Sequence, residues 1–143
     1  MKKIIIILLL TFAIALTPIF FISFNTDYLV KPALFPPQIL FPIIWSILYI
    51  LMSVSLYLTT KYDRDLYKIY FIQLTLNTLW SPIFFGLKFY LISVFIIILL
   101  IISVIIMIYQ MFFKNKYASY LQIPYLLWLL FALYLNISIY LLN

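Results

Sequence analysis

The chain has 143 residues, of which 69% are hydrophobic and 8% charged, and its formal net charge is +6. A soluble domain is about 45–50% apolar and about 25% charged, so this composition excludes a water-soluble domain, a nucleic-acid-binding module and a disordered chain. Three acidic residues, no histidine and no cysteine leave almost no side chains for metal binding or acid–base catalysis. We therefore expect an integral membrane protein without a metal site.

Charged residues gather in clusters along the chain, and each apolar stretch between two clusters is long enough to cross a bilayer core of about 30 Å as a helix. The five predicted spans cover residues 4–22, 39–58, 69–87, 89–113 and 117–142. Their continuous apolar runs lack the alternation of a transmembrane β-barrel. The sequence thus predicts one all-α domain, residues 1–143, that forms a bundle of five transmembrane helices.

The first predicted span also resembles a secretory signal peptide, with Ala13, Ile14 and Ala15 as a candidate cleavage site. Its apolar run is longer than the usual stretch of about 7–15 residues, which favours a retained first helix over a cleaved signal.

The basic residues predict an orientation in the membrane. Seven of them lie at the N-terminus and in the second and fourth loops, namely Lys2, Lys3, Lys61, Arg64, Lys68, Lys114 and Lys116. Only Lys31 and Lys88 lie in the other loops. Because cytoplasmic loops are enriched in lysine and arginine, we expect the N-terminus inside and the C-terminus outside a bacterial cytoplasmic membrane, with the proline-rich loop 23–38 outside. A mitochondrial outer membrane is the alternative location.

The predicted spans contain no aspartate, glutamate, lysine, arginine or histidine. Proton-coupled and ion-coupled carriers place ionisable residues at membrane depth, so this absence argues against that class of transporter. Passive binding or transfer of a hydrophobic molecule remains open.

Aromatic and amide residues recur at helical spacing within three of the spans. These residues are Trp45, Tyr49 and Met52, then Gln73, Asn77, Trp80 and Phe84, and finally Pro124, Trp128, Ala132 and Asn136. Amides in a span should point into the bundle, where they form either interhelical hydrogen bonds or ligand contacts. The tryptophans form either an interfacial belt or the walls of an apolar pocket. The prolines at positions 42, 82 and 124 either kink their helices or mark helix starts.

Three sequence blocks resemble the tryptophan-rich sensory protein/translocator protein family (TspO, the peripheral benzodiazepine receptor family). They are KPALFPPQILFPIIWSILYILM at 31–52, QLTLNTLWSPIFFGLK at 73–88 and LQIPYLLWLLFALYLN at 121–136, and they occur in the family's order and spacing. The resemblance implies a five-helix bundle, often a homodimer. It also implies a pocket in one half of the bundle, covered by the loop between the first two helices.

The resemblance implies a function as well, namely binding of porphyrin-type tetrapyrroles and of isoquinoline or benzodiazepine-like ligands. The matching motifs assign ligand binding to Trp45, Tyr49, Asn77, Trp80, Phe84, Trp128 and Ala132, and the covering lid to Pro32, Phe35, Pro36 and Pro37. No cofactor is expected, because a porphyrin would be the ligand or the substrate. In members that resemble light-dependent porphyrin-degrading enzymes, Trp45 and Trp128 would be the reactive pair.

The predicted lid departs from the family pattern. Asn25, Thr26, Leu34 and Ile39 stand at positions where the family often has aromatic residues, so this lid offers less aromatic surface to a porphyrin.

Three functions follow as hypotheses. The first is a tetrapyrrole-binding receptor or sensor, and the second is a light-dependent porphyrin-degrading enzyme. The second ranks lower, because the sequence shows no pairing of a nucleophile with a base. The third is a lipid or sterol transfer protein. The expected partners are a hydrophobic small molecule, membrane lipid and a second copy of the chain, without nucleic acid.

Overall fold

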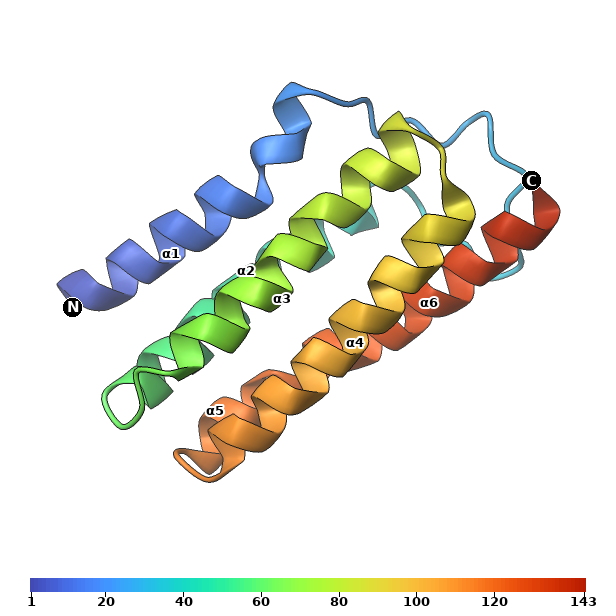
Figure 1. The fold of residues 1–143 in the computed structure, drawn as a ribbon. Helices are drawn as coiled ribbons and strands as arrows, with labels where there is room; N and C mark the ends of the chain where they lie inside the picture. Colours follow the sequence, from blue (N-terminus) through green and yellow to red (C-terminus); the bar gives the residue numbers. More distant parts are fainter.

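The structure is a computed structural model that describes residues 1–143, and every regular element in it is helical. The helical segments run alternately up and down one long axis, and the two termini lie at opposite ends of the molecule (Figure 1). The elements are α1 (Lys2–Ala15), the 3₁₀-helix η1 (Thr17–Phe20), α2 (Leu40–Thr60), α3 (Leu66–Ser81), the π-helix η2 (Pro82–Gly86), α4 (Tyr90–Phe112), α5 (Lys116–Leu121) and α6 (Ile123–Leu142). Only Gln122 separates α5 from α6.

Three helices are long and apolar enough to cross a membrane, namely α2, α4 and the continuous stretch of α5 and α6. The α-helical parts of the first and third segments are shorter, with 14 residues in α1 and 16 in α3. A proline follows each of them, Pro18 in η1 and Pro82 in η2. Proline has no N–H to donate to the carbonyl four residues earlier, so the α-helix gives way to another helical geometry there.

The sequence left open whether the prolines at positions 42, 82 and 124 kink their helices or mark helix starts, and the structure shows that they differ. Pro42 and Pro124 lie in the first turns of α2 and α6, where a missing backbone N–H leaves no intrahelical hydrogen bond unmade. Pro82 instead begins the π-helix, in which the N–H of Leu87 donates to the Pro82 carbonyl at 2.9 Å. Two of these prolines therefore mark helix starts, and the third changes the helical geometry.

The bundle is apolar on its outer surface as well as inside. α4 packs against both α3 and α6, while α1 packs against α2 and α3. The core includes fully buried side chains such as Met52, Leu74 and Met107. Outward-facing side chains such as Leu99 and Ile102 are 53% and 49% exposed. An apolar surface of this extent suits contact with lipid rather than with water.

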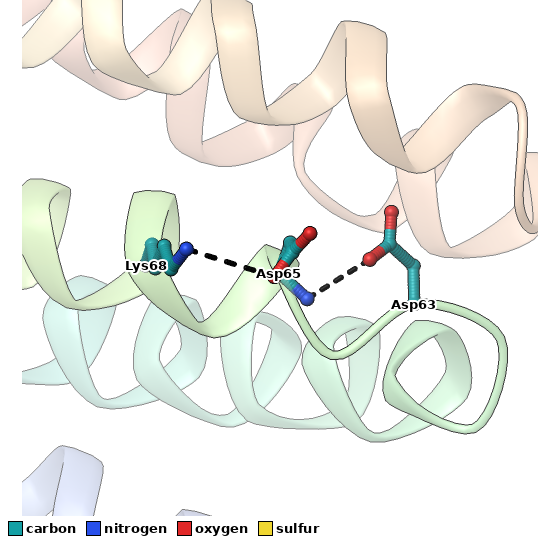
Figure 2. Close-up of polar contacts among 3 residues, drawn as sticks. All are labelled: Asp63, Asp65 and Lys68. Carbon is teal, nitrogen blue, oxygen red and sulfur yellow. Dashed lines mark hydrogen bonds and ion pairs between the residues drawn. The ribbon is translucent and has the colours of Figure 1, made fainter.

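One end of the bundle, here called the basic end, holds the N-terminus and the loops 61–65 and 113–115 (Figure 1). In the first of these loops the N–H of Asp65 donates to Asp63 Oδ1 at 2.9 Å, and Lys68 Nζ lies 3.7 Å from Asp65 Oδ1 (Figure 2). Lys114 Nζ lies 3.9 Å from Asp63 Oδ2 and so connects the two loops. Ion pairs at the surface add little to stability. The pair between Lys114 and Asp63 is informative because it shows that the two loops lie next to each other.

Candidate functional site

An aromatic cluster of Trp45, Tyr49, Tyr125 and Trp128 joins α2 to α6. Trp45 stacks on Tyr49, one helical turn further along α2, with ring centroids 5.6 Å apart and an interplanar angle of 28°. Tyr125 and Trp128 of α6 meet Trp45 edge-on, at centroid distances of 6.2 and 6.5 Å. Offset-stacked and edge-on pairs are the favoured arrangements of aromatic rings, so the cluster is stabilised as it stands.

A polar network lies beside the aromatic cluster and joins three helices. Tyr49 Oη donates to Asn77 Oδ1 at 3.3 Å, and Asn77 Nδ2 donates to Tyr125 Oη at 2.9 Å. Tyr125 Oη in turn donates to Gln73 Oε1 at 2.8 Å. All four side chains are buried, and the Nε2 of Gln73 has no hydrogen-bond partner. The two amides of α3 thus hold the aromatic rings of α2 and α6 in place.

Trp80 belongs to a second group of residues nearer the opposite end of the bundle. Its ring stacks on Phe84 at a centroid distance of 5.1 Å, and its Nε1 donates to Asn136 Oδ1 at 2.9 Å. Asn136 Nδ2 donates to the carbonyl of Ala132 at 2.7 Å. Phe84 packs with Leu29, which lies between α1 and α2 in the chain. Because Trp80 also packs against the main core, it connects this group to the aromatic cluster.

The 21–39 segment, between η1 and α2, contains no helix and crosses this end of the bundle (Figure 1). Phe35 contacts Phe41 at a centroid distance of 5.8 Å, and Phe41 contacts Trp128 at 6.0 Å. A continuous row of rings therefore leads from the 21–39 segment to the aromatic cluster.

The 21–39 segment is hydrogen-bonded to two side chains, Tyr134 of α6 and Asn143, the residue after α6. Tyr134 Oη donates to the carbonyl of Ala33 at 2.6 Å. Asn143 binds Val30 twice, because its Oδ1 accepts from the Val30 N–H at 3.0 Å and its Nδ2 donates to the Val30 carbonyl at 3.1 Å. The segment is thus attached to α6 at two places.

The predicted lid residues differ in exposure, since Pro32, Phe35 and Pro36 are half-buried while Pro37 is exposed. The four positions that depart from the family pattern also differ. Thr26 is buried, whereas Asn25, Leu34 and Ile39 are exposed, and Leu34 adopts a left-handed backbone conformation with φ of 67°. Three of the four thus point their side chains away from the bundle interior.

The structure brings the predicted binding residues together in two adjoining groups. Trp45, Tyr49, Asn77 and Trp128 lie in the aromatic cluster and its polar network, and Trp80, Phe84 and Ala132 lie in the second group. Sequence reasoning missed Tyr125 and Phe41, which contact the same rings. Tyr125 lies three residues before Trp128, and Phe41 lies four residues before Trp45. Residues at these spacings share a helix face, so the spacing could have identified both as neighbours of the tryptophans.

These residues offer flat apolar ring surfaces, amide and phenol hydrogen-bonding groups and oxidisable indoles. No charged side chain takes part in either group, and no group of acidic, histidine or cysteine side chains is arranged to hold a metal ion. The arrangement suits binding of a flat hydrophobic molecule better than hydrolytic chemistry, which needs a nucleophile and a base.

The protein is an all-helical bundle with an apolar outer surface, and tryptophan, tyrosine and amide side chains lie inside it. These are the features of a helical membrane protein. The sequence profile of the TspO/MBR family matches residues 4–142, and the chain belongs to that family. The membrane character predicted from composition and the family indicated by the three sequence blocks are thereby confirmed.

Relatives support the same assignment. The chain is 40% identical over 117 residues to the tryptophan-rich protein TspO of Archaeoglobus fulgidus, covering 79% of this chain and 76% of that one. It is 36% identical over 123 residues to protein CrtK of Rhodobacter capsulatus, covering 82% and 77%. It is 33% identical over 119 residues to the tryptophan-rich sensory protein of Cereibacter sphaeroides, covering 82% and 75%.

Proposed function

We propose that this protein is a membrane receptor or sensor that binds a porphyrin-type tetrapyrrole, and also isoquinoline or benzodiazepine-like molecules, at the aromatic cluster. The observation that carries the proposal is the meeting of Trp45, Tyr49 and Trp128 beside the polar network, because flat ligands bind between aromatic rings with a few polar groups to orient them. Membership of the TspO/MBR family supports it.

In this proposal the macrocycle inserts between Trp45 and Trp128. Their present contact is edge-on, with an interplanar angle of 89°, so a ligand would replace one ring contact by two stacking contacts. Asn77 orients the ligand through the second hydrogen of its Nδ2, because that nitrogen donates only to Tyr125 Oη. The 21–39 segment is the lid, and Phe35 is its aromatic contact with the row of rings that reaches Trp128.

A titration with protoporphyrin IX tests the proposal. Purified protein in detergent should show saturable quenching of tryptophan fluorescence and a saturable change in porphyrin absorbance. The double substitution Trp45→Phe with Trp128→Phe should weaken binding about tenfold, because each phenyl ring covers about 30 Å² less of the macrocycle than an indole does, which at about 25 cal/mol per Å² costs about 0.7 kcal/mol at each position. Tyr120→Phe, an exposed position on α5, is the matched control. An unsaturable response, or equal affinity in the double variant, would contradict the proposal.

Light-dependent porphyrin breakdown is the second candidate function. It is favoured by the short distances between the oxidisable rings, 5.6 Å from Trp45 to Tyr49 and 6.5 Å from Trp45 to Trp128. In the same titration samples, illumination would deplete the porphyrin absorbance with the wild type and not with the double variant. A protein that co-purifies with lipid and ignores porphyrin would favour lipid or sterol transfer instead.

We also propose that the chain crosses a bacterial cytoplasmic membrane five times, with its N-terminus inside. Support comes from η1 and η2, which lengthen the first and third segments, and from the lysines and the arginine that the sequence places at the N-terminus and in or beside the two loops of the basic end. Because the chain has no cysteine, single thiols can report its orientation. In intact cells an impermeant maleimide should label Lys88→Cys and spare Arg64→Cys until the cells are lysed. The reverse pattern would overturn the orientation.

A further inference from the structure

A groove opens between α2 and α6 on the outer surface of the bundle. α2 packs mainly against α1 and, near the basic end, against α5, and it meets α6 at few positions. The space left between them has a volume of about 470 Å³, within the range of about 300–1,000 Å³ typical of small-molecule sites. Ile47 and Leu51 line it from α2, and Leu127, Trp128 and Phe131 line it from α6.

The lining of the groove suits a molecule dissolved in lipid. It contains no charged, amide or hydroxyl side chain, and the rim residues Ile47 and Leu127 are 53% and 61% exposed on the bundle surface. A polar molecule arriving from water would lose its hydration there without gaining hydrogen bonds in return. A hydrophobic molecule already in the bilayer pays no such cost.

Trp128 is the single side chain shared by the groove and the aromatic cluster. It forms part of the groove wall, and its ring meets Trp45 at 6.5 Å and Phe41 at 6.0 Å. Its Nε1 is buried and has no hydrogen-bond partner. A buried unpaired donor is destabilising, so a ligand that brings an acceptor to this nitrogen would be favoured over the present packing.

The other sides of the aromatic cluster are covered. The 21–39 segment lies over one end and is fastened there by Tyr134 and Asn143. α1 packs against both α2 and α3, and α4 packs against both α3 and α6, so these neighbouring helices are in contact with each other. Beside the cluster, α2 and α6 are neighbouring helices with a gap between them, and the α2–α6 groove occupies that gap.

We propose that the α2–α6 groove is a lateral entrance, through which a hydrophobic ligand dissolved in the bilayer reaches the aromatic cluster when the Trp128 ring moves aside. The inference rests on the proposed binding function, since it supplies the route to that site. It implies that the ligand concentration in the membrane, rather than in water, sets the rate of binding.

A reversible block of the groove tests this entrance. Leu127→Cys places a thiol on its rim in a chain that otherwise has none, and benzyl methanethiosulfonate then attaches a bulky group that a reductant removes. Ile102→Cys on α4, also exposed to lipid, is the matched control. Association of protoporphyrin IX with protein in lipid nanodiscs is followed by stopped-flow tryptophan fluorescence, and the oligomeric state is measured by light scattering.

Modification of Leu127→Cys should slow both association and dissociation about tenfold or more, leave the Kd nearly unchanged and be reversed by reductant. The same reagent on Ile102→Cys should change neither rate. Equal slowing in both variants, a weaker Kd with an unchanged association rate, or a changed oligomeric state would each overturn the entrance. The last result would mean that a second copy of the chain covers the groove. If the unmodified protein shows no saturable binding, the proposed function fails, and the entrance fails with it.

Discussion

Truncation of Tyr125 to alanine should lower the free energy of unfolding by about 3–5 kcal/mol, the usual cost of removing a large buried aromatic ring. The side chain is completely buried and meets Trp45 edge-on at 6.2 Å. Its hydroxyl accepts from Asn77 and donates to Gln73, so the truncation also leaves two buried amides short of a partner. Packing and hydrogen bonding are lost together, which makes this the largest single-residue effect expected in the bundle.

Thermal unfolding in detergent, followed by circular dichroism, measures this effect. Tyr125→Phe keeps the ring and removes only the hydroxyl, so it should cost about 0.6–1.7 kcal/mol, as interhelical hydrogen bonds in membrane proteins do. Tyr120→Ala removes an exposed tyrosine on α5 and should leave the midpoint nearly unchanged. If Tyr125→Ala unfolded at the same temperature as Tyr120→Ala, the cluster would not be a stabilising element.

Release of the 21–39 segment from α6 is the second large effect expected. Tyr134→Phe combined with Asn143→Ala removes the hydrogen bond to Ala33 and both hydrogen bonds to Val30. At about 0.5–1.5 kcal/mol each, the three bonds together favour the closed segment by about 1.5–4.5 kcal/mol. The open form should therefore become at least about tenfold more populated, since each 1.4 kcal/mol is a factor of ten.

Hydrogen–deuterium exchange of the 21–39 amides measures this opening, because exchange requires local opening of the segment. Faster exchange should be confined to this segment and leave α4 unaffected. Tyr140→Phe, on the same helix and without a hydrogen bond from its hydroxyl, is the control. Unchanged exchange in the double variant would show that apolar packing around Leu29 and Phe84 holds the segment without help from these bonds.

Much of the helical architecture follows from the sequence, because apolar length is the dominant signal in a membrane protein. The predicted stretch 89–113 agrees closely with α4 at Tyr90–Phe112. The α-helices of the first and third segments end earlier than predicted, at Ala15 and Ser81. Hydropathy does not register the geometry imposed by proline, so a 3₁₀-helix and a π-helix complete those stretches where continuous α-helix was expected.

The sequence predicts less of the site than of the fold, because most contacts in the site join different helices. Stacking of Trp45 on Tyr49 is a contact between residues four apart on one helix, and helical periodicity predicts it. The hydrogen bond from Trp80 to Asn136 joins residues 56 positions apart, and the one from Asn77 to Tyr125 joins residues 48 apart. Such contacts depend on how two helices are rotated against each other, which the period of a single helix does not specify.

The unpaired N–H of Trp128 gives the protein a built-in spectroscopic label. Trp80 donates its indole N–H to Asn136, whereas Trp128 donates to nothing, so the two indoles differ in hydrogen bonding although both lie within the bundle. Vibrational bands and emission energies of indole respond to that difference. The chain has only three tryptophans, so single Trp→Phe variants would assign each signal. A ligand that reaches Trp128 would then change the signal of that indole, without any added dye.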